Sequence, residues 1–148
     1  MDIIIRPAET SDFDSVVHIL NQVQALHVNW RPDIYKESKD FFSLDAFQDA
    51  LDKEAFYVAE SEHRIIGILE LTYRHIEFPS MLTRDVIYID TMAVDENYRG
   101  MGIGHHFFEM LKDLKKAKHF DGIELQVNAK NDAAYEMYKK SGFTGKSN

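Results

Sequence analysis

The middle of the chain contains a strand pattern, a glycine-rich turn and a helix pattern in direct succession. Residues 84–94, RDVIYIDTMAV, are rich in β-branched residues and predict a strand. Apolar residues at helical spacing begin with Ile103 and Phe107, immediately after the glycines, and a second strand pattern, GIELQV, follows at 122–127. A strand, a helix and a strand in this order predict a right-handed crossover between two parallel strands.

The segments that precede this unit predict antiparallel strands. AFYVAES at 55–61 and RIIGILELTYRH at 64–75 are rich in β-branched and aromatic residues, and only the tight connection SEHR joins them. They are expected to be neighbours of each other and of strand 84–94. Together with the parallel strand, they predict an α/β (α+β) fold with a mixed, mostly antiparallel central sheet.

Three further helices are predicted at 13–27, 44–51 and 132–140. Ser11 and Asp14 have the spacing of a capping box before the first helix, and Ser43 is placed to cap the second. Gly142 follows the third helix, where a left-handed C-cap is common. The central sheet is therefore expected to be flanked by helices.

Length and composition favour a single domain that comprises residues 1–148. With 45% hydrophobic residues, a chain of 148 residues can bury a stable core without disulfides or a structural metal. The lack of cysteine excludes disulfides, thiolate metal sites and a cysteine nucleophile, and it favours a cytoplasmic setting; no metal site is predicted. A net charge of −8 without a basic face argues against nucleic-acid binding, and no apolar run approaches membrane length.

Gly100, Gly102 and Gly104 fall in the connection between strand 84–94 and the helix that follows. The first turn of a helix has unpaired backbone N–H groups and carries the positive end of the helix dipole. Glycine there removes the Cβ and permits positive φ, so several N–H groups can point at one anion. The stretch is therefore predicted to bind phosphate, with added charge from Arg99.

Two common phosphate motifs do not fit the chain. A Walker P-loop that ends in the tail sequence GKS at 145–147 would need a glycine at position 140, which is lysine. A dinucleotide fingerprint would need its third glycine at His105 or at Phe107, depending on the register. Neither motif explains the spacing of the glycines.

The spacing Arg99-x-x-Gly102-x-Gly104 matches the Arg/Gln-x-x-Gly-x-Gly/Ala pattern of the GNAT superfamily of acyl-CoA N-acyltransferases, which the chain resembles over residues 86–143. The strand VIYIDTMAV precedes the pattern, and the downstream stretch LQVNAKNDAAYEMYKKSGF is similar to the second cofactor motif of that family. The resemblance implies an N-acetyltransferase that uses acetyl-CoA, with a parallel strand pair that splays apart at the site of coenzyme A.

The resemblance also implies a position for each part of the cofactor. The pantetheine arm would pair with the backbone of Met92, Ala93 and Val94. The pyrophosphate would lie on the backbone amides of the loop, whose residues are Arg99, Gly100, Met101, Gly102, Ile103, Gly104 and His105. Asn131 matches an asparagine that contacts the pantetheine region. The alternative is that Asn131 is merely the cap of the final helix, although one residue can fill both roles.

Tyr138 matches the family's tyrosine that protonates the departing thiolate of coenzyme A. The alternative for Tyr138 is a core-facing aromatic residue, whose hydroxyl would still need a partner if buried. Tyr135, one helical turn earlier, is the substitute candidate for the acid.

Two carboxylates on the predicted strands are candidates for the general base. Glu70 lies among apolar residues, where its pKa would be raised if it faced a cleft. Asp90 shares one face of the next strand with Tyr88 by period-two alternation. The alternatives are that both carboxylates lie on a solvated face and that an ordered water relays the proton. Backbone N–H groups near Ala93 or Val94 are expected to stabilise the oxyanion.

The first helix and the loop after it line the acceptor pocket in similar proteins. Here this region contributes His27, Trp30 and Tyr35, and Tyr88 would join them, although Trp30 could equally anchor the core. The expected acceptor is a primary amine of a small molecule or peptide. The alternative function is a non-catalytic acyl-CoA-binding sensor.

A homodimer is also expected from the short C-terminal end. Members of the family usually continue past the closing Gly-Phe into a final strand, whereas only TGKSN follows Phe143 here. A sheet edge left exposed in this way is prone to association.

Overall fold

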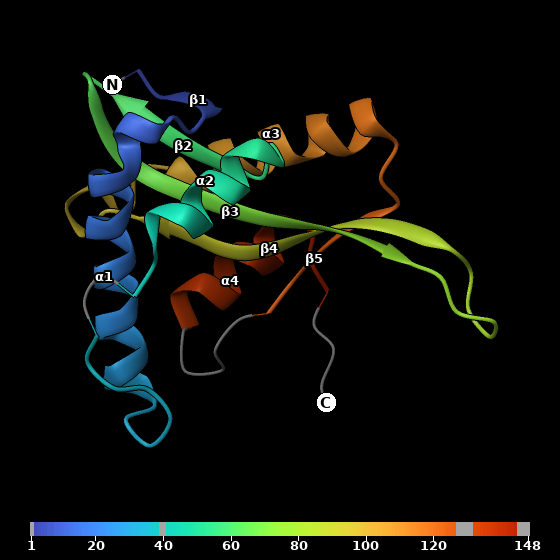
Figure 1. Ribbon diagram of the computed structural model, residues 1–148, viewed down its shortest axis with the longest axis horizontal. Helices are drawn as coiled ribbons and strands as arrows, with labels where there is room; N and C mark the ends of the chain where they lie inside the picture. Colours follow the sequence, from blue (N-terminus) through green and yellow to red (C-terminus); the bar gives the residue numbers. More distant parts are fainter. Residues whose placement is uncertain (1, 39–40, 127–131, 145–148) are drawn as a thin grey trace.

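A five-stranded sheet forms the centre of the computed structural model, which describes residues 2–38, 41–126 and 132–144 (Figure 1). The strands lie in the order β1-β2-β3-β4-β5. The elements are, in chain order, β1 (Ile4–Pro7), the 3₁₀ helix η1 (Thr10–Asp12), α1 (Phe13–Trp30), α2 (Leu44–Asp52), β2 (Phe56–Ser61), β3 (Arg64–Ile76), β4 (Arg84–Val94), the 3₁₀ helix η2 (Glu96–Tyr98), α3 (Ile103–Lys118), β5 (Gly122–Leu125) and α4 (Asp132–Lys140).

The strand pairing confirms the predicted mixed sheet. Strands β1 to β4 pair antiparallel, whereas β5 lies parallel to β4, with Val86 opposite Gly122 and Ile89 opposite Leu125. Helix α3 connects β4 to β5, as the strand, turn and helix patterns predict.

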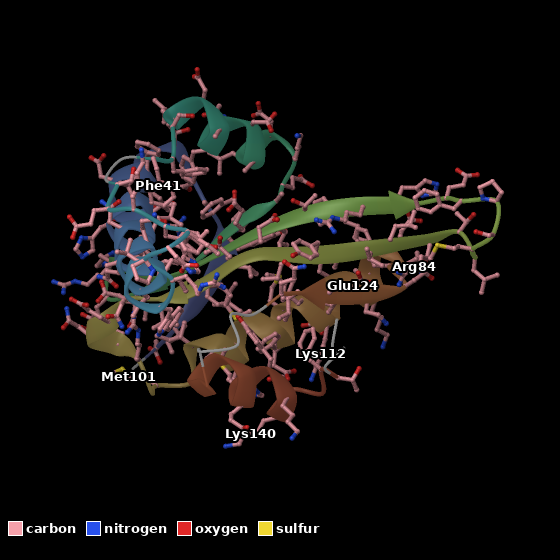
Figure 2. The ribbon with its side chains drawn as sticks, turned by 90° about the horizontal axis from the view of Figure 1, so that it is seen from below. Phe41, Arg84, Met101, Lys112, Glu124 and Lys140 are labelled. Atoms are coloured by element: carbon pink, nitrogen blue, oxygen red, sulfur yellow. The ribbon has the colours of Figure 1, made fainter. Side chains whose placement is uncertain are left out.

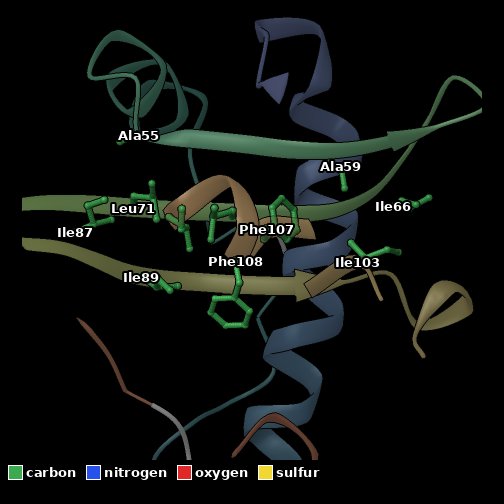
Figure 3. Packing of buried hydrophobic residues seen from close by; sticks show 11 residues of the cluster. Ala55, Ala59, Ile66, Leu71, Ile87, Ile89, Ile103, Phe107 and Phe108 are labelled. Carbon is green, nitrogen blue, oxygen red and sulfur yellow. The ribbon is translucent and has the colours of Figure 1, made fainter. Parts of the chain in front are cut away.

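Helices cover both faces of the sheet (Figure 2). On the α1–α2 face, the buried residues are Ala8, Val16, Ile19, Leu20, Phe47, Ala50, Phe56, Val58 and Ile68. On the α3–α4 face, α3 buries Ile103, Phe107, Phe108 and Leu111 against β2, β3 and β4 (Figure 3). Burial of each phenylalanine stabilises the fold by about 2 kcal/mol of transfer free energy. The two cores together hold the sheet between the helix layers.

A β-bulge in β4 turns two consecutive side chains toward the α1–α2 face. Glu70 on β3 pairs with Thr91, but Leu71 pairs with Ile89, so Asp90 is the extra residue on β4. Leu71 and Ile89 both pack in the α3–α4 core. Asp90 and Thr91 therefore both lie on the face that Glu70 shares.

Strand β4 extends past the end of β5. The last β4–β5 pair is Ile89 with Leu125, and from Thr91 to Val94 the ladder partners of β4 within the described residues all belong to β3. This end of β4 leads through η2 into α3. The free edge of β4 and the start of α3 consequently border the same region, which is the arrangement expected for a splayed parallel pair.

Two expectations about the first helix are wrong. The capping box at the start of the helical segment contains Asp12, not Asp14. The Asp12 carboxylate accepts a hydrogen bond from the Glu9 N–H at 2.8 Å and another from the Arg6 guanidinium at 2.9 Å. Helix α1 then continues to Trp30 instead of ending near His27. The other two predicted caps are confirmed: Ser43 Oγ accepts the Ala46 N–H at 3.0 Å, and Gly142 has a φ of +99°.

The β3–β4 hairpin projects well beyond the helix layers in both views (Figures 1 and 2). Among the described residues, no helix has both the length and the apolar character that a membrane span requires.

The outer edge of β5 pairs with no described strand. The homodimer was expected because such an edge is prone to association, and this edge is the one concerned.

Candidate active site

The loop between β4 and α3 has the backbone geometry of an anion-binding turn. Gly100 and Gly102 have φ angles of +81° and +79°, which L-residues with side chains rarely adopt. A Cβ built on either glycine would meet no atom within 4 Å, so the backbone is open to solvent. These two glycines are needed for backbone conformation and not to avoid a clash.

Gly104 also meets a packing requirement, beside the cofactor contact that the sequence predicts for it. It lies in the first turn of α3 without positive φ, and a Cβ there would lie 2.7 Å from Sδ of Met137 on α4. The missing side chain therefore lets α4 approach α3 closely. Only Gly100 and Gly102 shape the loop itself.

The start of α3 presents unpaired donors. The first helical hydrogen bond runs from the His106 N–H to the Gly102 carbonyl at 3.2 Å. The N–H groups of Ile103, Gly104 and His105 precede it and have no acceptor within the described part of the chain. Arg99 lies beside this turn, with Nε 3.4 Å from the carbonyl oxygen of Val94. The turn thus combines free donors, the positive helix end and a guanidinium group.

Met92, Ala93 and Val94 form the end of β4, where no described strand pairs with its β5-side edge. Met92 and Val94 pack against the α3–α4 core, and Ala93 packs against the α1–α2 core. The backbone between them is thereby held from both faces, while its edge polar groups stay available to an extended ligand.

Glu70 and Asp90 form a carboxylate pair on the α1–α2 face. Glu70 is half-buried, and burial raises its pKa, with a further increase from the negative charge of Asp90. The Thr91 hydroxyl lies 3.4 Å from Glu70 Oε1 and acts in the opposite direction. Asp90 is exposed and accepts a short hydrogen bond from the Thr72 hydroxyl. Asp90 is therefore exposed to solvent, as expected if both carboxylates lay on a solvated face, whereas Glu70 is half-buried.

The ring of Tyr138 packs in the α3–α4 core, and its hydroxyl is left without a described partner. The ring meets Phe108 edge-to-face at 5.6 Å and Phe143 at 6.0 Å. Burial raises the pKa of the hydroxyl. No described residue hydrogen-bonds to this hydroxyl, which is not among the enclosed polar atoms that lack a described partner, such as His27 Nδ1. Tyr138 is therefore a core residue by its ring and a possible proton donor by its hydroxyl.

The residues expected to bind the acceptor form two separate groups. His27 stacks on Tyr35 at 4.8 Å and meets Trp30 edge-on at 6.0 Å, at the end of α1. Burial lowers the pKa of His27, and its Nδ1 is buried with no described partner. Tyr88 belongs instead to the sheet, where the guanidinium of Arg74 lies 3.8 Å from its ring centre.

Several residues of this site were absent from the sequence expectations. Thr72, Arg74 and Thr91 join the site through the register of β3 against β4 and through the bulge, neither of which has a sequence signature here. Asn131 lies outside the described residues, and of Tyr135 only the helical backbone is described. No group of three histidine or acidic side chains within the described ranges could hold a metal ion.

A groove of about 430 Å³ lies along the surface where α3 and α4 meet. Its lining includes Lys112 and Lys140, whose ammonium groups bring positive charge to the groove, together with the carboxylate of Glu136 (Figure 2). A second hollow lies between α1 and the loop, where the Gln22 side chain accepts the Glu96 N–H at 3.0 Å and so ties the loop to α1.

Comparison with known proteins shows which family has this combination of loop, sheet and helices. The chain matches the model of the acetyltransferase (GNAT) family over residues 21–143. It therefore belongs to the GNAT acetyltransferase family, as the motif around Arg99 and Gly102 predicted.

Individual relatives agree with this assignment. An N-alpha-acetyltransferase of Sulfurisphaera tokodaii is 28% identical over 145 residues, which cover 94% of this chain and 78% of the relative. A streptothricin acetyltransferase of Escherichia coli is 28% identical over 106 residues, or 72% of this chain, and the match spans only 55% of that protein. A mutant of the BH1408 protein of Bacillus halodurans has a structure similar to this one, with a TM-score of 0.87, 31% identity and coverage of 98% and 95% of the two chains.

Proposed function

We propose that the protein is an N-acetyltransferase that moves the acetyl group of acetyl-CoA directly to a primary amine of a small molecule or peptide while both substrates are bound. The observation that carries this proposal is the open first turn of α3 beside the free end of β4, with Glu70 on the adjacent strand. Family membership and the names of the relatives support the same activity.

The residues present fit coenzyme A. The N–H groups of Ile103, Gly104 and His105 would hold its pyrophosphate, since the loop exposes them at the positive helix end. The free edge of β4 at 92–94 would pair with the amides of the pantetheine arm. Lys112 and Lys140 would favour the phosphorylated nucleotide end in the groove between α3 and α4. When bound, acetyl-CoA supplies an acetyl group activated as a thioester.

The chain itself would provide the proton transfers. The amine must lose a proton to attack, and the partly buried Glu70, whose pKa is raised toward neutrality, is suited to accept it. A backbone N–H on the free edge near Ala93 or Val94 would stabilise charge that develops on the acetyl oxygen. The Tyr138 hydroxyl would donate a proton to the departing thiolate, since it has no competing described acceptor.

A thiol-release assay tests the reaction. The protein is incubated with acetyl-CoA and a panel of primary amines, and free thiol and N-acetylated product are measured together. We expect amine-dependent thiol release with equal amounts of both products. Binding of acetyl-CoA without thiol release on any amine would instead support the alternative, an acyl-CoA-binding sensor.

Glu70→Gln is expected to lower activity while raising stability at neutral pH. Because the folded-state pKa of Glu70 is raised, the stability it contributes is fully present below its ordinary pKa and is lost as pH rises through the folded value. Glutamine stays uncharged, so the unfolding midpoint at neutral pH should rise. Loss of the base should lower kcat/KM by about 100-fold or more. Thermal unfolding and steady-state kinetics measure the two effects.

Asp90→Asn provides the matched test for this assignment. Removing the negative charge of Asp90 lowers the pKa of Glu70, so the acid limb of the kcat/KM profile should move to lower pH. A limb that stays in place, or Glu70→Gln with unchanged kcat/KM, would contradict the role of Glu70 as base.

A further inference from the structure

Arg74 on β3 is an arginine for which no ion pair is found within the described part of the protein. Its guanidinium lies over the ring of Tyr88, 3.8 Å from the centre. Arg6, Arg31 and Arg84, by contrast, each pair with a carboxylate at 2.8 to 2.9 Å. No carboxylate within the described ranges pairs with Arg74, which is exposed.

Stacking of this kind orients the donors of the guanidinium. The guanidinium carbon lies over the ring of Tyr88. In a guanidinium stacked on an aromatic ring, the N–H donors lie in the plane of the group and stay available to another partner. A guanidinium held in this way offers a fork that matches a planar anion, and less side-chain entropy is lost when the anion binds.

Arg74 lies on the same face of the sheet as the carboxylate pair. Glu70, Thr72 and Arg74 alternate along β3, and Thr72 is paired with Tyr88 and bonded to Asp90. Tyr88 and Asp90 are two residues apart on β4, which corresponds to about 7 Å along a strand. The guanidinium over Tyr88 is therefore about one side-chain position from Asp90 and about two from Glu70.

The row of side chains from Glu70 to Arg74 on this face has opposite charge at its two ends. Glu70 and Asp90 favour an ammonium group, and Arg74 disfavours one, because a second cationic group placed over Tyr88 would be repelled. A polycationic acceptor that extends along the row would meet repulsion at its far end. A molecule with an amine at one end and an anion at the other matches both.

Resting on the proposed acetyltransferase function, we propose that Arg74, held over Tyr88, binds a carboxylate of the amine acceptor. The acceptor is an amino acid or short peptide whose carboxylate is separated from the reacting amine by several bonds. Arg74 is then a specificity-determining residue, and it takes no part in proton transfer.

The test compares amines of graded length. Glycine, β-alanine, γ-aminobutyrate, ε-aminocaproate and glycylglycine are offered with acetyl-CoA, each beside its carboxamide. In the wild-type protein, kcat/KM should be highest for one of the longer carboxylates and at least about 10-fold lower for its amide. Arg74→Met should remove that preference through KM, and its kcat/KM on the amides should stay near the wild-type value.

Three controls separate this proposal from its alternatives. Arg84→Met removes the same charge from the same strand pair, but from a guanidinium already paired with Glu124 at 2.9 Å, and it should keep the carboxylate preference. Arg74→Lys keeps the charge and loses the planar fork, so it should retain only part of the preference. O-Phosphoethanolamine tests a phosphate in place of the carboxylate, and an Arg74-dependent preference for it would overturn the carboxylate assignment.

The outcomes distinguish a failure of this inference from a failure of the proposed function. Acetylation of amines with equal kcat/KM for acids and amides, or equal losses on both in Arg74→Met, would overturn the role of Arg74 and leave the acetyltransferase intact. If no amine is acetylated, calorimetric titration with N-acetyl-ε-aminocaproate and its amide decides the matter: binding of the acid that Arg74→Met weakens supports the anion site. Equal binding of both compounds overturns it.

Discussion

Gly102→Val is expected to weaken binding of acetyl-CoA by at least about 10-fold, because valine at a φ of +79° costs 1 to 2 kcal/mol or more. A Cβ at this position meets no atom within 4 Å, so the effect comes from the backbone conformation and not from a clash. The loop would leave its left-handed geometry, and the N–H groups at the start of α3 would no longer point at one anion. Calorimetric titration with acetyl-CoA measures the change.

Gly142→Val is the matched control for this substitution. Gly142 also has positive φ, and a Cβ there also meets nothing within 4 Å, but it follows α4 and lies outside the phosphate loop. Both variants should lose a similar free energy of unfolding, and only Gly102→Val should lose affinity. Equal affinity losses would point to general destabilisation, and unchanged affinity in Gly102→Val would remove the phosphate-loop assignment.

Tyr138→Phe is expected to lower kcat by about 100-fold to 10,000-fold with little change in the affinity for acetyl-CoA. The substitution keeps the ring that contacts Phe108 and Phe143, so the α3–α4 core should stay intact. What it removes is the hydroxyl, whose raised pKa keeps it protonated through the neutral range. Steady-state kinetics, thermal unfolding and cofactor titration together separate chemistry from folding.

Tyr57→Phe serves as the comparison for Tyr138→Phe. Tyr57 is also half-buried against the α3–α4 core, and its pKa is also raised by burial, but its hydroxyl interacts with Tyr73. Tyr57→Phe should therefore change the free energy of unfolding more than it changes kcat. An unaltered kcat in Tyr138→Phe would exclude the hydroxyl as the acid and make Tyr135 the next candidate.

Most of the fold could be predicted because its elements have strong local patterns. The strands at 64–76 and 84–94 are long and rich in β-branched residues, and α3 repeats apolar residues at helical spacing. The start of α1 at Phe13 was predicted correctly, but its cap was misassigned because Ser11 and Asp14 fit a capping box by spacing, whereas the actual cap depends on Arg6, which comes from β1. A contact between separate elements has no local pattern.

The cofactor loop and the acceptor side differ in how far they could be predicted. The loop is continuous in sequence, so its residues and its left-handed glycines could be inferred from Arg99, Gly102 and their surroundings. Gly104 shows the limit of that inference, since its requirement comes from Met137 on another helix. The acceptor face is assembled from two strands, and Arg74 acquires its importance only because β4 places Tyr88 beneath it.

The sequence by itself therefore determined the family, the order of strands and helices, and the glycine loop between β4 and α3, because each depends on residues close together in the chain. The tertiary structure alone decided which carboxylate is half-buried and which side chains share the face of the sheet that we propose for the acceptor. The β4 bulge places Asp90 and Thr91 on one face beside Glu70, and the electrostatic environment of Glu70 follows from that pairing. Burial and charge proximity arise between strands, and so they became visible only once the sheet was assembled.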